Sequence, residues 1–264
     1  MLVFFGKHSE DWMNALNHKN LINDLTDFVD KIINCNNIKL LEFEKYIIPL
    51  MEKDMLLLYE NNINAIMPDI NAINIFSNKK LFYEYVIKNN LSEYIPKTYY
   101  SNEFLGKRYI SKPYTNNNGN GIVFLQRYLN KNINDTIIQE YIQSNEEYVC
   151  FLVALNGKII HYVAYKSIFN KINHIKSSYL TDFEQIKIML DEKYLKIIEL
   201  FLLPIKYNGV CNIDFKIIND EIKIFEINVR LGGTLMNPKY KNDLISILNV
   251  LLINYKELES GFNC

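Results

Sequence analysis

The chain has 264 residues, a formal net charge of −1 and 22% charged residues, so bulk charge gives no reason to expect a nucleic-acid or membrane partner. Hydrophobic residues make up 49% of the sequence with regular polar interruptions, which indicates a globular fold and not a disordered chain. The four cysteines contain no C-x-x-C pair, and no stretch approaches the roughly 20 apolar residues of a membrane span. We therefore expect reduced thiols and a cytoplasmic protein.

The N-terminal part of the chain predicts a small α/β unit whose strands pair in parallel, because strand-like and helix-like patterns alternate there. The expected strands lie at 2–5, 46–50 and 63–67, and the expected helices at 21–33 and 52–60. Ser77 is expected to cap the next helix, which runs from Asn78 to about Asn89.

A polar loop follows in the middle of the chain, between a predicted strand at 109–113 and another at 122–125. The first strand carries Lys112 and closes with Pro113. Glycine permits positive φ, and the backbone N–H groups of such a loop can wrap phosphates. No Gly-Lys-Ser/Thr follows, so this is not a P-loop, and by itself an Asn/Gly-rich tip is most often a turn. The residues of interest in the loop are Asn118, Gly119 and Gly121.

Asn156-Gly157 predicts a hairpin between strands at 147–155 and 158–166. A two-residue turn would pair Glu147 with Lys166 on one face of the hairpin, at the edge of a group of apolar side chains. The alternative is an exposed ion pair worth under ~1 kcal/mol. Further on, the capping box at 181–184 predicts a long helix that ends near residue 202.

The most informative stretch is a second hairpin at 209–234. Alternation places Glu226, Asn228 and Arg230 on one face of its second strand. A two-residue turn would direct Asp214 away from Glu226, so we predict a three-residue loop or a bulge that sets the two acids opposite each other. Two carboxylates and an amide oxygen suit Mg²⁺, whereas the alternative is an amphipathic hairpin with a solvated charged face.

Asp214, the run Phe225-Glu226-Ile227-Asn228-Val229-Arg230 and the following Gly232-Gly233-Thr234 resemble the metal-binding end of the ATP-grasp superfamily. The resemblance implies an α/β (α+β) ATP-grasp fold at 76–264, with two α+β subdomains that grip ATP. The lid is expected at about 97–142, the metal-binding subdomain at about 143–264, and a short α/β domain at 1–75.

The same resemblance implies the site residues. Mg²⁺, or Mn²⁺ as an alternative, is expected at Asp214, Glu226 and Asn228, and catalytic roles at Arg230 and Lys166. Lys79 is assigned to the phosphates, with Lys80 as its competitor; Glu140 to the adenine amino group; and Glu147 to the ribose. The complete set of implied ATP contacts is Lys79, Lys112, Asn118, Gly119, Gly121, Gln139, Glu140, Tyr141, Ile142 and Glu147.

The activity that the resemblance implies is ATP-dependent carboxylate–amine ligation through an acyl phosphate, with small-molecule carboxylate and amine substrates such as amino acids or peptides. Two alternatives stay open: a phosphotransferase that stops at the phosphorylated product, and a nucleotide-binding module that requires a partner chain. No nucleic acid or membrane is expected to bind, and the short first domain is compatible with a homodimer.

Overall fold

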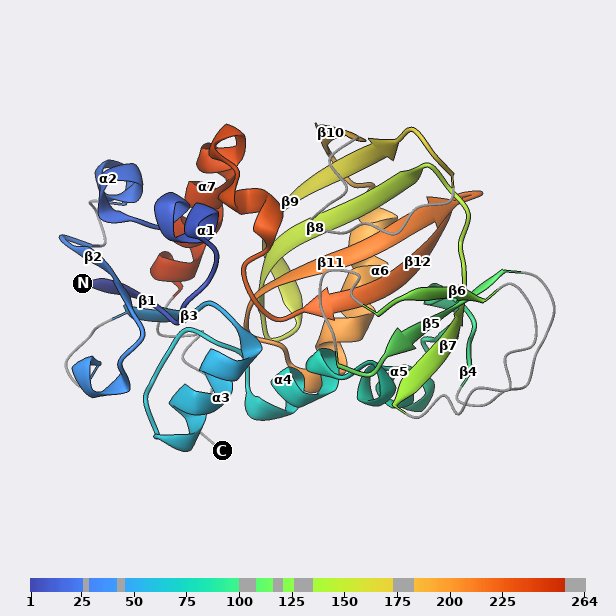
Figure 1. Ribbon diagram of the computed structural model, residues 1–264, viewed down its shortest axis with the longest axis horizontal. Helices are drawn as coiled ribbons and strands as arrows, with labels where there is room; N and C mark the ends of the chain where they lie inside the picture. Colours follow the sequence, from blue (N-terminus) through green and yellow to red (C-terminus); the bar gives the residue numbers. More distant parts are fainter. Residues whose placement is uncertain are drawn as a thin grey trace.

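The computed structural model describes residues 1–25, 29–41, 46–99, 108–115, 121–125, 135–172 and 183–254. The described strands form three sheets, of three, five and four strands. Figure 1 shows the three-stranded sheet at the left, the five-stranded sheet in the centre and the four-stranded sheet at the right. None of the described helices is both long and apolar enough to cross a membrane. The predicted domain boundaries, the homodimer and the cytoplasmic location stay predictions.

The first sheet is parallel, as the alternation of strands and helices predicted. β1 (Leu2–Phe5) lies between β2 (Ile32–Cys35) and β3 (Tyr46–Pro49). α1 (Glu10–Ala15) and α2 (His18–Leu21) precede β2, and α3 (Glu52–Glu60) follows β3.

Two elements predicted for this region are wrong. The helix expected at 21–33 is absent from the described part of that range, where α2 ends at Leu21 and β2 begins at Ile32. Among the described residues of that range, Leu21 is buried from the end of α2, Leu25 and Val29 from the connection, and Ile32 from β2. The strand expected at 63–67 does not form either: Ile66 N donates to Ile47 O, and Met67 makes only an isolated bridge.

Two helices lead into the second sheet. α4 (Ile70–Ser77) is followed directly by α5 (Lys79–Lys88). The capping residue of α5 is Asn78 and not Ser77: the Asn78 side chain accepts from Lys80 N and Leu81 N, whereas Ser77 donates its hydroxyl to Ile73 O. The sheet that follows is antiparallel and comprises β4 (Thr98–Tyr99), β7 (Thr136–Glu140), β5 (Tyr109–Pro113) and β6 (Val123–Leu125).

The third sheet is antiparallel and carries most of the candidate site. Its strands, in spatial order, are β10 (Phe183–Ile188), β9 (Lys158–Phe169), β8 (Glu146–Leu155), β11 (Gly209–Ile218) and β12 (Glu221–Asn228). The helices α6 (Glu192–Leu202) and α7 (Lys241–Ile253) pack against it.

The helix predicted from the capping box is partly wrong. Phe183–Ile188 pairs with β9 as a strand, and α6 begins only after its N-cap Asp191, whose side chain accepts from Lys193 N. An available sheet edge at β9 overrides a local helix-start signal, because pairing satisfies the backbone of the whole segment at once.

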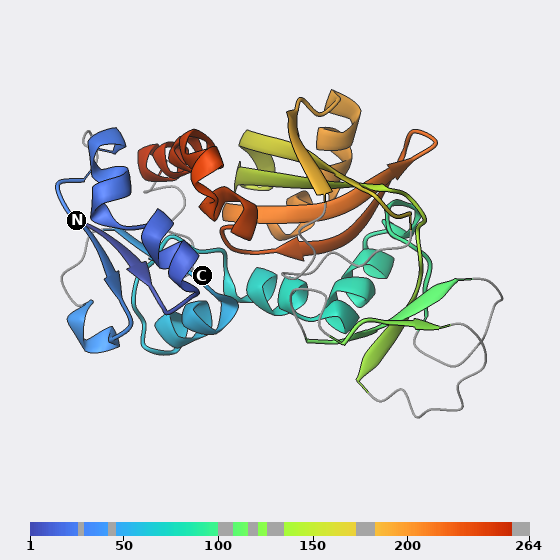
Figure 2. The ribbon, with the colours of Figure 1, turned by 45° about the horizontal axis from the view of Figure 1, so that its top comes forward.

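The two faces of the five-stranded sheet belong to two hydrophobic cores. One face carries Cys150, Ile213 and Phe215 and packs in a core with α4, α5 and α6. The other face carries Val149 and Phe151 in a core with α1 and α7. Both cores also include residues of the three-stranded sheet, so this sheet is packed against the rest of the molecule on both sides (Figure 2).

The hairpin between β8 and β9 has the predicted turn but not the predicted register throughout. Asn156 and Gly157 have φ of +49° and +79°, and Leu155 pairs with Lys158 as expected. The register then shifts between Val153 and Ala154, so Glu147 lies opposite Ser167. The predicted pairing of Glu147 with Lys166 is therefore wrong.

Candidate nucleotide- and metal-binding site

Asp214 and Glu226 lie directly opposite each other on β11 and β12. Ile218 pairs with Glu221 across the two-residue turn Asn219-Asp220, whose φ values are +50° and +67°. A bulge between Asp214 and Phe215 then restores the alignment of the two acids. We predicted either a bulge or a three-residue loop. The structure confirms the bulge and has a two-residue turn in place of the longer loop.

The bulge also changes which side chains share a face. Regular alternation would place Phe225 on the apolar face with Ile227, but the centroid of the Phe225 ring instead lies 5.3 Å from Lys112 Nζ. Ile224 and Ile227 are both buried in the α6-side core. The extra residue at the bulge therefore turns Phe225, Glu226 and Asn228 to the side that faces the four-stranded sheet.

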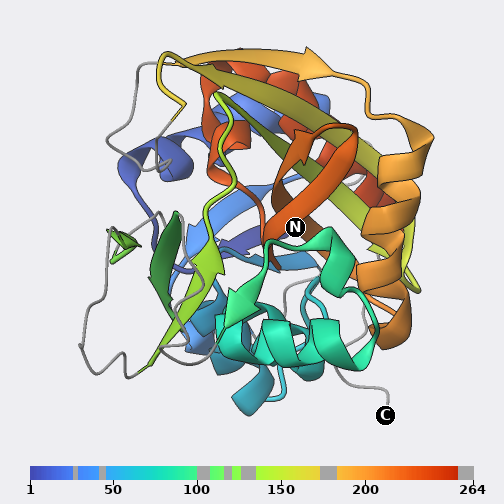
Figure 3. The same ribbon diagram turned by 90° about the vertical axis from the view of Figure 1, so that its right-hand side faces the viewer.

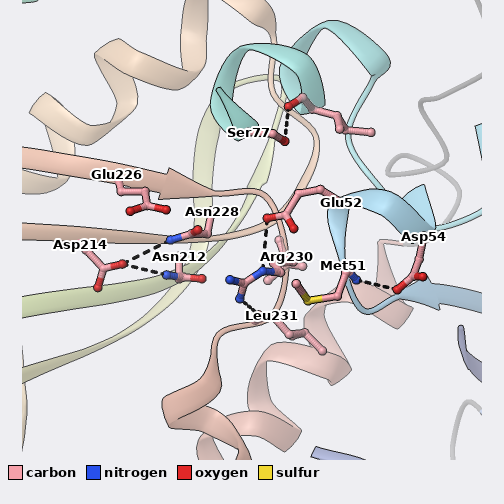
Figure 4. A network of polar contacts seen from close by, with 12 residues as sticks. Met51, Glu52, Asp54, Ser77, Asn212, Asp214, Glu226, Asn228, Arg230 and Leu231 are labelled. Atoms are coloured by element: carbon pink, nitrogen blue, oxygen red, sulfur yellow. Dashed lines mark hydrogen bonds and ion pairs between the residues drawn. The ribbon is translucent and has the colours of Figure 1, made fainter. Parts of the chain in front are cut away.

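Amide groups bracket the Asp214 carboxylate (Figure 4). Asn228 Nδ2 lies 3.3 Å and Asn212 Nδ2 lies 3.4 Å from the same oxygen, Asp214 Oδ2. With its nitrogen engaged by Asp214, Asn228 has its amide oxygen left to serve as a ligand. Two carboxylates and this oxygen are a hard-oxygen donor set that fits Mg²⁺ or Mn²⁺ with phosphate and water completing the shell. Within the described ranges no three His, Cys, Asp or Glu side chains cluster as a metal site by themselves.

Lys79 reaches this group from the first turn of α5. Its Nζ lies 4.0 Å from Glu226 Oε1, and its backbone N donates to Tyr114 O. Lys80, the competing residue, instead pairs with Glu84 along the exposed side of α5. The structure thus brings Lys79, and not Lys80, next to the acids.

Lys112 is buried in the four-stranded sheet, and its Nζ lies near Phe225 of β12. Figure 3 views the molecule from the side of the four-stranded sheet. Its Nζ donates to Gln139 Oε1 at 2.6 Å, and Gln139 Nε2 donates to Thr98 Oγ1 at 3.0 Å. Burial lowers the pKa of Lys112 to about 8, while the charge of Glu226 acts to raise it and that of Lys79 to lower it. These neighbours show that the predicted phosphate and metal residues converge.

The segment after β7 crosses from the four-stranded to the five-stranded sheet. Tyr141 N donates to Arg108 O, and Tyr141 OH donates to Ile172 O. Glu147, at the start of β8, is buried and shares a face with Val149, which lies opposite Asp214. Glu147 is therefore on the site face, as expected.

Glu140 is placed differently. It pairs with Tyr109, so strand alternation puts its side chain on the opposite face of the four-stranded sheet from Gln139 and Lys112. The structure does not group the Glu140 carboxylate with the buried lysine.

Arg230 follows β12 and links the metal residues to the N-terminal region. Its Nε lies 3.2 Å from Glu52 Oε1 and its Nη1 donates to Leu231 O. The guanidinium also lies 6.0 Å from the centroid of the Trp12 ring, on which His8 stacks. Burial, with the positive charge of Arg230, lowers the pKa of His8.

Lys166 is not in the site. It lies opposite Tyr148, and its Nζ donates to Glu146 Oε1 at 3.0 Å. Tyr148 stacks on Phe215, on the α6 side of the sheet. The bulge in the β8–β9 hairpin thus places Lys166 on the face away from Asp214. Asn118 and Gly119 lie outside the described residues; Gly121 has φ of +73°, in the left-handed region that favours glycine.

Three residues of the region were not predicted: Glu52, Asn212 and Lys216. Asn212 is 6% exposed, and among the described residues its Oδ1 has no hydrogen-bond partner. Alternation from Asp214 could have found Asn212 and Lys216, since both lie two residues from it on the same face. The sequence around Glu52 does not indicate a role in the site, because Glu52 meets Arg230 only through the packing of α3 in the folded protein.

Known proteins share this fold. The ATP-grasp domain family matches residues 76–234, which is more than half of the chain. A D-alanine–D-alanine ligase from Bacillus anthracis superposes with a TM-score of 0.65 at 15% identity, covering 98% of each chain. An L-amino acid ligase from Bacillus licheniformis has a TM-score of 0.66 at 11% identity, covering 96% of this chain and 73% of that one. No curated protein matches by sequence.

A third structural relative is the biotin carboxylase of Campylobacter jejuni, with a TM-score of 0.57 at 14% identity over 99% of this chain and 71% of that one. These identities show the fold alone. Lys112 of the four-stranded sheet and Lys79 of α5 approach the aligned acids of the five-stranded sheet, an arrangement typical of an α/β protein that binds a nucleotide between two sheets. The chain belongs to the ATP-grasp family, which confirms the fold predicted from the sequence.

Proposed function

We propose that the chain is an ATP-dependent carboxylate–amine ligase that forms an amide or peptide bond and releases ADP and phosphate. The observation that carries the proposal is the alignment of Asp214 with Glu226, on the face that Lys79 and Lys112 approach from α5 and β5. Opposed clusters of acids and lysines suit a substrate that brings its own dense negative charge together with a divalent cation.

Each part of the site has a place in this reaction. Lys79 and Lys112 would bind the phosphates, and Glu147 would take the ribose hydroxyls. Asp214, Glu226 and Asn228 would hold Mg²⁺ or Mn²⁺. The bound cation would neutralise part of the negative charge of the phosphates. Attack by the substrate carboxylate on the γ-phosphoryl group breaks its bond to ADP and gives an acyl phosphate. Attack by the amine then expels phosphate and forms the amide.

Arg230 would stabilise the charge that develops on the transferred group, because it follows Asn228 and is held in place by Glu52. Glu140 and Lys166 are not part of the proposal, since the structure turns both away from the aligned acids.

Amino acids and dipeptides form the first substrate panel, because the solved relatives include ligases named for D-alanine and for L-amino acids. The protein is incubated with ATP, Mg²⁺ and each substrate, and ADP, free phosphate and products are measured. A ligase gives ADP, phosphate and an amide, and with hydroxylamine in place of the amine it gives a hydroxamate.

The alternatives give other results. A phosphotransferase gives ADP and a stable phosphorylated product without free phosphate, and a binding module that needs a partner chain binds ATP without releasing ADP. Lys112→Ala should weaken ATP binding at least about tenfold through loss of a charge-assisted contact. Lys79→Ala should do the same, whereas Lys80→Ala should bind ATP like the wild type.

A further inference from the structure

Trp12 is the only tryptophan in the chain, and its indole N–H makes no hydrogen bond to a described residue. It lies on α1 and is 6% exposed, in the core on the α7 side of the five-stranded sheet. The N–H of a buried indole usually has a hydrogen-bond partner. Protein atoms do not fully cover this nitrogen, so an oxygen atom of a ligand can still reach it.

Arg230 has a second donor of this kind. Its Nε faces Glu52 and its Nη1 donates to Leu231 O (Figure 4). Its Nη2 makes no hydrogen bond to a described residue and is not fully covered either. The guanidinium lies 6.0 Å from the centroid of the Trp12 ring. Two donor groups from opposite ends of the chain therefore lie side by side.

The position of Gly233 keeps the edge of the indole open. Gly233 is exposed, and a Cβ added to it would lie 3.8 Å from Trp12 Nε1 and 3.9 Å from Trp12 Cζ2. These are ordinary van der Waals distances, so a side chain would fit there and cover the N–H. With glycine at this position the space in front of the donor is left to a ligand.

The charges around Trp12 favour an anion. His8 stacks on the indole at a centroid distance of 3.9 Å. Burial lowers the pKa of His8, and the positive charges of Arg230 and Lys53 lower it further. Glu52 compensates part of this positive charge through its pair with Arg230. Donors without acceptors in such surroundings suit a carboxylate, whose oxygens accept charge-assisted hydrogen bonds.

We propose that Trp12 is a substrate-binding residue whose indole N–H donates to the carboxylate that the ligase activates, next to Arg230. The inference rests on the proposed function. One carboxylate oxygen attacks the γ-phosphoryl group, and the N–H holds the other, which becomes the carbonyl oxygen of the acyl phosphate. When the amine attacks, the C=O electron pair moves onto this oxygen, and the N–H stabilises the charge. The pair returns as phosphate leaves with a proton from the amine.

The fluorescence of Trp12 reports on this contact directly, because the chain has no other indole. The wild type is titrated with acetate, D-alanine, L-alanine and L-glutamate, with and without Mg²⁺ and a non-hydrolysable ATP analogue. Acetamide, L-alaninamide and sodium chloride at equal ionic strength are the controls. We expect a saturable change with at least one carboxylate and none with the amides or chloride.

Two variants test the donor itself. Trp12→Phe keeps an aromatic ring in the core and removes the N–H, and Gly233→Ala places a methyl group against the indole edge. Each should lower kcat/KM for the best carboxylate of the panel about tenfold, the loss of one charge-assisted hydrogen bond. The dissociation constant of ATP with Mg²⁺, measured by calorimetry, should stay within about twofold of the wild-type value.

Tyr46→Phe is the matched control. It removes a hydroxyl from the same core at the opposite end of the three-stranded sheet, where Tyr46 pairs with Leu2 at the start of β1. This variant should keep the wild-type kcat/KM and ATP affinity. Thermal melting shows whether each variant folds, and if Trp12→Phe does not, Gly233→Ala decides.

Several results would overturn the inference. Carboxylates that leave the fluorescence unchanged, or amides that change it equally, would show that Trp12 does not recognise a carboxylate. Wild-type kcat/KM in the folded variants would exclude the contact, and an equal loss of ATP affinity would show a structural effect. ADP release without any fluorescence response would contradict this inference alone. A response to carboxylates without ADP release from any substrate would contradict the proposed function and leave the carboxylate contact standing.

Discussion

Lys112 Nζ donates a 2.6 Å hydrogen bond to Gln139 Oε1, and this bond joins two neighbouring strands inside the four-stranded sheet. Gln139 is itself oriented by Thr98, whose hydroxyl donates to Pro96 O. A chain of three buried polar side chains therefore holds one ammonium group toward β12. The neutral amide of Gln139 does not compensate the cost of burying the Lys112 charge, so burial lowers the pKa of this lysine.

The unfolding free energy should depend on pH through Lys112. Its pKa is lowered from 10.5 to about 8 by burial, so between these values the folded protein binds fewer protons than the unfolded chain. Stability should therefore rise as the pH increases from about 8 to 10.5, by up to about 3 kcal/mol.

Urea unfolding of the wild type and Lys112→Met at several pH values, with chelator and without nucleotide, measures this effect. The difference between the two proteins isolates Lys112 from other groups that titrate in the range. The wild type should gain stability relative to the variant above pH 8. Parallel pH curves would show that the lysine keeps an ordinary pKa.

Glu226→Gln and Asn228→Ala should each reduce ADP release by about a hundredfold or more while leaving the fold intact. Glu226→Gln removes the negative charge and one oxygen of the carboxylate, and Asn228→Ala removes the amide oxygen, in both cases without opening the core. Glu221→Gln is the control, because Glu221 is an exposed acid at the other end of β12. ADP release is measured with the best substrate of the panel, and the fold by circular dichroism. Wild-type turnover in Glu226→Gln would remove this residue from the metal set.

The sequence was most informative where local patterns decide the structure. Strand 109–113 and the two strands of the 209–228 hairpin are found where alternation and turn residues placed them. The bulge at Asp214 could be expected because an acid between Ile213 and Phe215 has to face something polar. Counting strand positions back from the Asn156-Gly157 turn gave the wrong face for Lys166. The bulge between Val153 and Ala154 shifts the register, and nothing in the order of apolar and polar residues indicates it.

Contacts over long distances along the chain could not be predicted. Alternation places Lys216 on the face of Asp214, but its burial against Ile142 and Tyr141 follows only from the fold. Phe183–Ile188 follows a helix-start signal, yet the free edge of β9 makes it a strand. Glu52 meets Arg230 only because α3 packs beside the end of β12.

Breaking the Glu52–Arg230 pair should destabilise the protein markedly. The two side chains are 15% and 9% exposed, and removal of one partner leaves the other charge buried. Loss of one member of a buried pair typically costs about 3–5 kcal/mol, and residual exposure places Glu52→Ala at the lower end, about 3 kcal/mol. Urea unfolding measures it. Glu60→Ala, an exposed acid at the end of the same helix, should cost under about 0.5 kcal/mol. Equal effects of the two substitutions would show that the pair contributes nothing specific.

The neighbouring glycines at 232 and 233 should respond very differently to alanine. A Cβ at Gly232 would lie 2.1 Å from the Phe151 ring and 3.1 Å from Asn212 Oδ1, whereas one at Gly233 would meet nothing closer than Trp12 Nε1 at 3.8 Å. Gly232 has φ of −102°, so backbone strain plays no part and the effect is purely steric.

Gly232→Ala should therefore destabilise the protein by about 2 kcal/mol or more, because neither a buried ring nor the adjoining strand can move far. Gly233→Ala should stay within about 0.5 kcal/mol of the wild type. Thermal and urea unfolding of both variants measure the difference. Phe151→Leu in the Gly232→Ala background should recover part of the loss by making room. If alanine at the two positions had the same effect, the segment after Arg230 would not pack on Phe151 as the structure has it.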